Sequence, residues 1–213
     1  MSVGLELQDI RLAIGDRTLI DGLSLTVSAG KAATIMGPSG AGKSALLDYI
    51  GGHLDPAFAA LGEVSVDGQT VTRLPADRRR IGILFQDDLL FPHLTVGQNI
   101  SFGLTASLRG AAVRAARVEA ALTEAGLAGF AHRDPATLSG GQRARAGLLR
   151  TLLAEPRALL LDEPFSTLDA SLRADFRRFV FGHAAARGLP VLLVTHDLAD
   201  AEAAGGPVLS IGG

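Results

Sequence analysis

The sequence predicts an α/β fold with a mainly parallel core sheet, an antiparallel β region at the N-terminus and a helical insert. Three observations lead to this prediction. An apolar strand, a glycine-rich loop and a helix follow one another near residue 40. Continuous apolar strands alternate with helices in the last third of the chain, which is typical of a parallel sheet covered on both faces. Between these halves lies an Ala-rich and Leu-rich stretch with helical spacing.

Short strands separated by turns open the chain. Apolar residues recur within 5–7, 10–14 and 23–27, and the pair Gly15-Asp16 marks a turn. Such punctuation every few residues is typical of antiparallel strands. The first part of the chain is therefore expected to be an antiparallel β region.

The pattern then changes to a strand, loop and helix unit. The run 32–36 is apolar, the next residues are rich in glycine, and apolar residues then recur at helical spacing over 45–50 before two glycines. A second strand and turn segment spans 62–71, and another apolar strand at 81–85 ends in Gln86.

The remaining elements complete the expected fold. The middle of the chain contains an Ala-rich helix at 111–125 and a second helix that Pro156 stops. The elements expected in the last third are a strand at 158–161, a helix at about 169–187, a strand at 191–195, a short helix and a strand at 208–211. We expect one domain over 1–213, with a core lobe of about 1–86 and 157–213 and a helical subdomain of about 87–156.

Composition excludes several classes of protein. A hydrophobic fraction of 47% argues against disorder, and no apolar run approaches the ~18 residues that span a bilayer. The absence of cysteine removes disulfides and thiolate metal sites. A net charge of −2 is a poor basis for binding nucleic acid, so no nucleic-acid partner is expected. The N-terminus lacks a signal-peptide pattern, which favours the cytoplasm.

A phosphate-binding loop occupies residues 37–44, where the sequence fits G-x-x-x-x-G-K-[ST] between an expected strand and helix. Glycines let the backbone wrap around phosphate oxygens, and the helix start directs N–H groups at them. Lys43 would reach the terminal phosphates, and Ser44 would offer a hydroxyl to Mg²⁺. The loop, called the phosphate loop below, comprises Gly37, Pro38, Ser39, Gly40, Ala41, Gly42, Lys43 and Ser44.

Polar residues also follow other expected strands at the sheet edge where α/β proteins bind ligands. Asp162 and Glu163 end the strand 158–161, and in phosphate-loop NTPases such a pair holds Mg²⁺ and activates the attacking water. His196 and Gln86 follow two further strands. Each of these residues alone is commonly structural, and the phosphate loop makes the functional interpretation the stronger one.

The string Leu138-Ser139-Gly140-Gly141-Gln142 is the most specific in the chain. Ser139 could simply cap a helix, with the glycines forming a tight entry. A capped helix start with two glycines is also complementary to a γ-phosphate. Since one nucleotide does not need two such sites from one chain, the second site is expected to serve a nucleotide on a partner chain.

In the order and spacing of these motifs, the sequence resembles the ATP-binding cassette (ABC) ATPases of ABC transporters over essentially its whole length. The matching motifs are the phosphate loop, Gln86, 138–142, Asp162-Glu163, the Ser166-Thr167-Leu168-Asp169 loop and His196. The resemblance implies the ABC-cassette version of the phosphate-loop NTPase fold, ATP and Mg²⁺ as cofactors, and ATP hydrolysis.

The resemblance also implies a role for each residue in a homodimer that forms when ATP binds. Signature residues of one chain close over ATP on the other, His196 contacts the γ-phosphate, and Asp169 bridges the subunits. Gln86 joins the metal ligands and couples nucleotide state to transmembrane permease subunits. The residues implied at the nucleotide and metal are Ser139, Gly140, Gly141, Gln142, Lys43, Ser44, Asp162 and Glu163.

The segment 85–96 is similar to importer cassettes that work with solute-binding proteins, a group that includes thiamine, iron(III), sulfate and polyamine systems. This resemblance implies a peripheral subunit on the cytoplasmic face of the inner membrane. Phe91 and Leu94 of this segment belong either to the core or to the permease contact. Ile14 stands where relatives commonly carry an aromatic that stacks on adenine, so the expectation is either loose base selectivity or adenine packed on Ile14 by apolar contact alone.

Other interpretations stay open at this point. An exporter-type cassette is opposed only by the segment after Gln86. A second alternative is a soluble ABC ATPase, a class that usually carries two cassettes or a coiled-coil insert, and 213 residues hold neither. A third is a phosphate-loop kinase, which would account for residues 37–44 but not for 138–142. The run Arg78-Arg79-Arg80 is expected to be a solvated turn.

Overall fold

A computed structural model describes residues 4–87 and 89–212. By their contacts the residues divide into two compact units. The first unit comprises Met1–Ile83, Arg157–Glu163 and Phe181–Gly213, and the second comprises Leu84–Pro156 and Pro164–Val180. Asp88, which belongs to the importer-like segment, lies outside the described residues.

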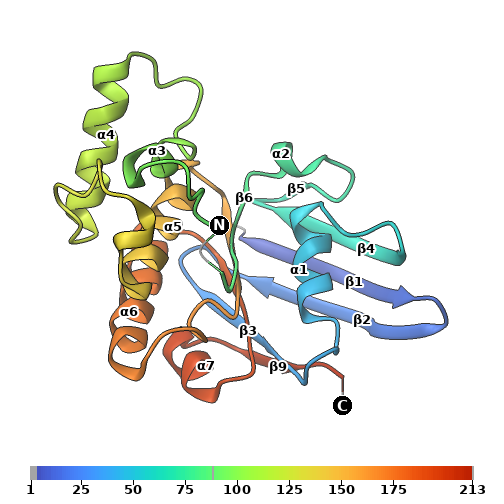
Figure 1. Cartoon of the computed structure of the whole chain (residues 1–213). Helices are drawn as coiled ribbons and strands as arrows, with labels where there is room; N and C mark the ends of the chain where they lie inside the picture. Colours follow the sequence, from blue (N-terminus) through green and yellow to red (C-terminus); the bar gives the residue numbers. More distant parts are fainter. Residues whose placement is uncertain (1–3, 88, 213) are drawn as a thin grey trace. The chain divides into compact units, whose positions relative to one another are not determined.

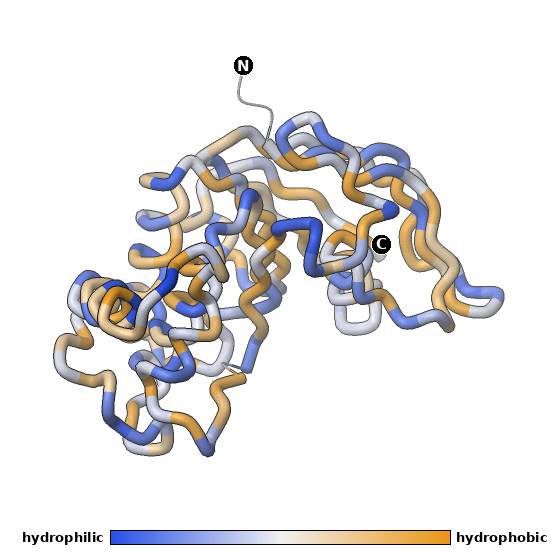
Figure 2. Tube along the Cα trace, turned by 90° about the horizontal axis from the view of Figure 1, so that it is seen from above, coloured by the Kyte–Doolittle hydropathy of each residue, from blue (hydrophilic) through white to orange (hydrophobic). Residues whose placement is uncertain are grey.

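The N-terminal region is an antiparallel sheet, as expected. Within the described residues it has four strands in the order β2-β1-β4-β5 (Figure 1). Figure 2 shows hydrophobic stretches along these strands and hydrophilic residues at the turns that join them. The strands are β1 (Leu5–Ile14), β2 (Arg17–Val27), β4 (Phe58–Val66) and β5 (Gln69–Thr70).

Strand β1 changes its buried face partway along because it contains a bulge. Leu5 and Leu7 are buried before the bulge, and Ile10 and Leu12 after it. The pairing of β1 with both neighbours shifts register in this segment, and Asp9 there has a φ of 49°. An extra residue exchanges the two faces of a strand. After the bulge, even-numbered residues of β1 therefore face the core.

The second sheet is parallel where its pairings are described, and its three central strands are buried on both faces. Its order is β6-β7-β8-β3-β9 among the described residues, and β3 pairs in parallel with β8 and β9. This confirms the predicted parallel core sheet. The strands are β3 (Ala32–Met36), β6 (Ile81–Leu84), β7 (Ala158–Asp162), β8 (Val191–Thr195) and β9 (Val208–Ser210).

Helix α1 (Lys43–Gly51) packs into one apolar core with strands of both sheets. Its buried residues Leu46, Leu47 and Ile50 join side chains of β1, β4 and β8, and the helix lies beside β1 and β4 in Figure 1. Two further helices are α6 (Ala170–Ala186) and α7 (Leu198–Ala204). The start of α1 is thereby fixed at the end of β3.

The expectation of a solvated arginine turn at 78–80 is wrong for its central residue. Arg79, in the short helix α2 (Ala76–Arg79), is only 7% exposed. Its guanidinium donates hydrogen bonds to four carbonyl oxygens, at 2.6 to 2.9 Å. These acceptors belong to Tyr49, Ile50, Thr72 and Leu74. Arg79 therefore ties the last turn of α1 to the loop before α2.

The second unit contains the helical stretch expected at about 87–156 and also Pro164–Val180, which was expected in the core lobe, and it has its own apolar core. Helices α3 (Val96–Ser101), α4 (Ala111–Glu124) and α5 (Gly140–Leu153) are followed by the first part of α6. Buried apolar residues of all three helices, such as Ile100, Leu122 and Leu149, pack together. Pro135–Thr137 forms a single 3₁₀ turn (η1) ahead of α5.

Candidate active site

The phosphate loop joins β3 to α1 in the first unit. Gly42 has a φ of 95°, a left-handed conformation, and an added Cβ there would lie 3.0 Å from the Cβ of Leu19. An added Cβ on Gly37 would lie 2.5 Å from the Ile211 carbonyl oxygen. Glycine is therefore required at both positions for the backbone to curl over the start of α1.

Lys43 is held inside this curl. Its side chain is 9% exposed, and Nζ donates hydrogen bonds to the Gly37 oxygen at 2.8 Å and the Pro38 oxygen at 3.1 Å. Nζ also lies 3.9 Å from Oε1 of Glu163. A single ammonium thus bridges the loop and the carboxylate beyond β7, at a helix N-terminus that itself favours anions.

Glu163 follows the last residue of β7 in a strained backbone conformation. Its φ is 45°, which is uncommon for a residue other than glycine, and its N–H donates to the Val194 oxygen at 2.9 Å. Oε2 lies 3.0 Å from Nδ1 of His196. The structure therefore brings Lys43, Glu163 and His196 into one connected cluster, and strain of this kind concentrates at functional sites.

A buried hydrogen bond shapes the turn that carries His196. The Thr195 hydroxyl donates to Oδ2 of Asp200 at 3.0 Å and accepts from the Asp197 N–H at 3.1 Å. The carboxylate of Asp197 caps α7. The chain therefore turns sharply after β8, and the His196 side chain is 64% exposed beside Glu163.

Ser44 and Asp162 form a pair of oxygen donors next to this cluster. Burial raises the pKa of the Asp162 carboxyl, and a hydrogen bond from Ser44 opposes that rise. The charges of Glu163 and Asp48 raise the pKa further, and Lys43 lowers it. Hydroxyl and carboxylate oxygens are the ligands that Mg²⁺ prefers, and a cation would relieve this repulsion. The donor set therefore fits Mg²⁺.

A pocket of about 370 Å³ opens over the phosphate loop within the first unit. Its lining residues are Leu19, Ser39, Gly40, Gly42, Lys43, Ser44, Ala45, Phe58 and Glu163. Ile14 ends β1 and pairs across the sheet with Phe58. Sequence reasoning did not single out Leu19 and Phe58, because neither belongs to a motif and only the pairing of the strands reveals their position.

In the second unit, the signature residues form the capped start of α5. The Ser139 hydroxyl accepts from the Gln142 N–H at 3.3 Å, and the Gln142 side chain accepts from the Ser139 N–H at 3.0 Å. This reciprocal pair is a capping box. Added Cβ atoms on Gly140 and Gly141 would touch Leu168 and Leu172, at 3.6 and 3.4 Å.

The structure also places Gln86 beside the signature helix. Gln86 and Gly140 line the same small cavity of about 70 Å³, together with Arg143 and Thr167. Asp169 precedes α6, and its carboxylate accepts from the Leu172 N–H and the Ser171 hydroxyl, each at 3.0 Å. The hydrogen bond from Leu172 is the main cause of a lowered pKa at Asp169. Gln86, the signature residues and Asp169 thus belong to the second unit, whereas the phosphate loop belongs to the first.

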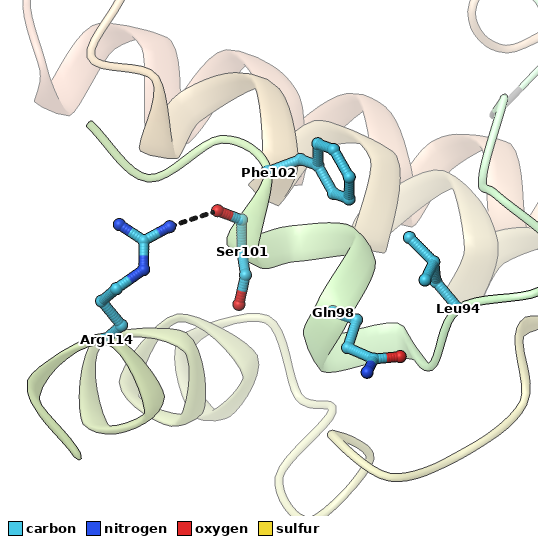
Figure 3. Close-up of a pocket in the computed structure, with 5 residues that line it drawn as sticks. All are labelled: Leu94, Gln98, Ser101, Phe102 and Arg114. Carbon is cyan, nitrogen blue, oxygen red and sulfur yellow. Dashed lines mark hydrogen bonds between the residues drawn. The ribbon is translucent and has the colours of Figure 1, made fainter. Parts of the chain in front are cut away.

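A separate pocket of about 460 Å³ lies in the segment after Gln86. It is lined by Leu94, Gln98, Ser101, Phe102 and Arg114, and Figure 3 shows these side chains around α3. Arg114 donates to the Ser101 carbonyl oxygen at 3.0 Å, which links α4 to the end of α3. Phe102 is 66% exposed.

The loop before α3 is held by one buried amide, Asn99. Its side chain accepts from the Phe91 N–H at 2.7 Å and donates to the Phe91, Leu94 and Thr95 carbonyl oxygens. The Phe91 ring packs 5.1 Å from the Phe102 ring and is 40% exposed. Phe91 is therefore exposed and Leu94 half-buried, on a loop that the Asn99 side chain holds by hydrogen bonds.

Comparison with known proteins gives consistent matches. The family model described as ABC transporter matches residues 20–166. The chain is 50% identical over 196 residues to the ABC transporter ATP-binding protein YnjD of Escherichia coli K12, covering 92% of this chain and 90% of that one. It is 44% identical over 178 residues to the thiamine import ATP-binding protein ThiQ of the same strain, covering 84% and 75%. It is 41% identical over 199 residues to the spermidine/putrescine import ATP-binding protein PotA of Nitrosomonas europaea, covering 93% and 54%.

Across the residues that the structure describes, no helix combines the length and the hydropathy that crossing a bilayer requires.

Proposed function

The chain belongs to the ABC transporter family of ATP-binding subunits, and from that premise we propose that it powers the import of a solute through a membrane permease. Relatives named as import ATP-binding proteins support the importer assignment. The observation that carries the proposal is the cluster of Lys43, Glu163 and His196 beside the phosphate loop. The subunit would sit on the cytoplasmic face of the inner membrane.

In this proposal the first unit binds ATP through its triphosphate. Oxygens of the β- and γ-phosphates replace the Gly37 and Pro38 carbonyl oxygens as partners of the Lys43 ammonium. Backbone N–H groups at the start of α1 face these phosphate oxygens as well. Ser44 and Asp162 would hold Mg²⁺. When bound, the metal neutralises charge on the phosphate oxygens.

Hydrolysis is assigned to Glu163 as general base. Its carboxylate takes a proton from a water molecule, the water oxygen attacks the γ-phosphorus, and the bond to the bridging oxygen breaks to leave ADP and phosphate. His196 holds the carboxylate through Nδ1, which leaves Nε2 to meet a γ-phosphate oxygen. The Lys43 ammonium lies 3.9 Å from the same carboxylate.

The second unit is proposed to act on a nucleotide held by another copy of the chain. Ser139, which is exposed, and Gly141, which is buried, lie at the start of α5, where a helix N-terminus favours an anion. Closure of two copies would place each α5 start on the γ-phosphate of the other, with Asp169 at the subunit boundary. Gln86 would respond to this closure, because it lines the same cavity as Gly140.

The permease contact is proposed at the pocket formed by Leu94, Gln98, Ser101, Phe102 and Arg114 (Figure 3). The pocket combines an exposed aromatic ring with a cationic side chain, and it follows Gln86 in the chain. A surface that combines polar and apolar side chains suits a short cytoplasmic segment of a membrane protein. Nucleotide state at Gln86 could then be passed to the permease.

The proposal is tested by purifying a tagged Glu163→Gln variant with ATP from gently solubilised membranes and identifying the proteins that accompany it by mass spectrometry. The substitution retains the shape of the side chain and removes its ability to take a proton, so the ATP-bound complex should persist. The Lys43→Ala variant, prepared in parallel, is the control that should bind ATP more weakly and retain less of the ATP-bound complex.

A multi-span permease together with a solute-binding protein is the expected result, and the ligand of that binding protein identifies the solute. A permease without a binding protein would indicate an exporter instead. No membrane partner in either preparation would contradict a role in transport.

A further inference from the structure

We propose that Phe58 supplies the aromatic surface on which the base of a bound purine nucleoside triphosphate stacks. This inference rests on the nucleotide site proposed above. It assigns the base end of that site to strand β4, across the sheet from Ile14.

Strand pairing fixes the direction of the Phe58 side chain. In the β1–β4 ladder, Leu12 lies opposite Ala60 and Ile14 lies opposite Phe58. Opposite residues of an antiparallel pair project from the same face of the sheet. Leu12 and Ala60 pack in the core with α1. Ile14 lies two residues after Leu12, and Phe58 lies two residues before Ala60. Because alternate residues of a strand share a face, Ile14 and Phe58 project on the face that carries α1.

The pocket over the phosphate loop has two chemically different ends. Ser39, Lys43 and Ser44 line the phosphate end, whereas Leu19, Ala45 and Phe58 provide apolar side chains. Among the described residues that line this pocket, Phe58 is the one with an aromatic ring. A nucleotide with its phosphates on the loop has its base at the apolar end.

The backbone at Phe58 is held by local hydrogen bonds that do not depend on a ligand. The Phe58 N–H donates to the Asp55 oxygen at 3.0 Å, and the Ala57 N–H donates to Oδ1 of Asp55 at 2.8 Å. This turn starts β4 at Phe58. The ring is only partly buried in the structure. A partly exposed ring on a backbone held in this way, beside a phosphate site, offers a stacking surface.

Stacking requires a π-face from the base and no particular hydrogen-bonding edge. Loss of the ring should therefore weaken binding of ATP and of GTP by a similar factor. Base stacking on an aromatic side chain is worth about 5- to 150-fold in affinity when the ring is removed. Binding of inorganic tripolyphosphate, which has no base, should not change.

The test uses calorimetric titration of the purified full chain with ATP, GTP and tripolyphosphate. Phe58→Ala should bind both nucleotides about 5- to 150-fold more weakly, and Phe58→Tyr should bind them like the parent protein. Leu61→Ala is the matched control, because Leu61 lies on the same strand and is 68% exposed. Its affinity should equal that of the parent. Unchanged nucleotide affinity in Phe58→Ala would overturn the inference.

A second variant separates this inference from the assignment of the phosphate loop. The chain contains no tryptophan, so Phe58→Trp places a single reporter at the proposed base site. ATP and GTP should quench its emission, and tripolyphosphate should not. Nucleotide binding without any change in emission would overturn the role of Phe58 alone. Failure of the parent protein to bind ATP would overturn the nucleotide site itself.

Discussion

The phosphate-loop cluster of the first unit and the signature helix of the second unit hold their polar groups in opposite ways. Lys43, Glu163 and His196 contact one another although they come from different elements. Ser139 and Gln142 instead bond to each other's backbone within one helical turn. The first region is a cluster of charged groups assembled from several elements. In the second, the polar groups make their hydrogen bonds within one turn, and the start of the helix faces solvent.

This difference indicates which chemistry each region can perform alone. An assembled cluster with a buried ammonium can bind a triphosphate in a single chain. A capped helix end offers only a partial charge, which is worth about 0.3–1 kcal/mol at an exposed site. We therefore propose that the signature helix acts on an anion that another copy delivers. The predictions below test whether the first unit binds ATP alone and the signature helix acts only with a second copy.

The largest effect is expected from Glu163→Gln. The variant should lose roughly 10²–10⁴ in hydrolysis rate and still bind ATP, because the general base is removed while the phosphate loop is intact. Steady-state phosphate release and ATP titration measure the two properties. Glu202→Gln on the exposed surface of α7 is the control and should keep the parent rate. Unchanged turnover in Glu163→Gln would exclude Glu163 as the base.

A smaller effect, on binding rather than rate, is expected from Lys43→Ala. Hydrogen bonds to charged groups contribute about 1.5–3 kcal/mol, so ATP affinity should fall about 10- to 150-fold. Titration of the nucleotide checks this. Lys31→Ala removes the only other lysine of the sequence, which is exposed, and should leave affinity unchanged. Full affinity in Lys43→Ala would refute the phosphate-loop role.

Ser139→Ala tests the second region and should separate binding from hydrolysis. ATP binding by the single chain should not change, while hydrolysis should fall by up to about tenfold through loss of one hydrogen bond across the dimer. The helix also loses its cap, at about 0.5–2 kcal/mol of stability. Activity against protein concentration and thermal melting measure the two effects.

Thr95→Ala is the matched control, because Thr95 caps α3 with the same reciprocal geometry. It should lower stability to a similar degree without slowing hydrolysis. Equal loss of hydrolysis in both variants would show that Ser139 only caps its helix and takes no part in hydrolysis.

Local sequence patterns predicted the elements that carry these residues. The apolar run of β3, the glycines of the phosphate loop and the helical spacing of α1 act over a few residues, so the sequence alone indicates them. The Ser139 cap is equally local. The contacts of Glu163 with Lys43 and His196 join residues that are distant in the chain, and only the sheet order brings them together.

The sequence could not predict features that depend on the partner of a side chain. Three consecutive arginines indicate a solvated turn, yet the carbonyl oxygens around Arg79 bury its guanidinium. Phe58 likewise appears as an ordinary apolar residue before the register of β4 is known. That register depends on the bulge at Asp9, which decides the face on which Ile14 and Phe58 project.

The smallest effect, and the one that compares the two regions most directly, is the pH dependence of stability. Burial raises the pKa of Asp162, so its ionised form disfavours the native state once the pH rises through that raised pKa. The Leu172 N–H lowers the pKa of Asp169, so its ionised form favours the native state until the pH falls through that lowered pKa.

Asp162→Asn should therefore raise the melting temperature of the nucleotide-free protein at neutral pH, and Asp169→Asn should lower it. The Asp162→Asn difference should shrink as the pH falls through the raised pKa, whereas the Asp169→Asn difference should persist down to about pH 4 and shrink only below it, because protonation makes each carboxyl neutral like the amide. Melting curves recorded between about pH 4 and pH 8 with a chelator present check the two signs. The same sign for both variants would show that the two regions do not differ in how they hold charge.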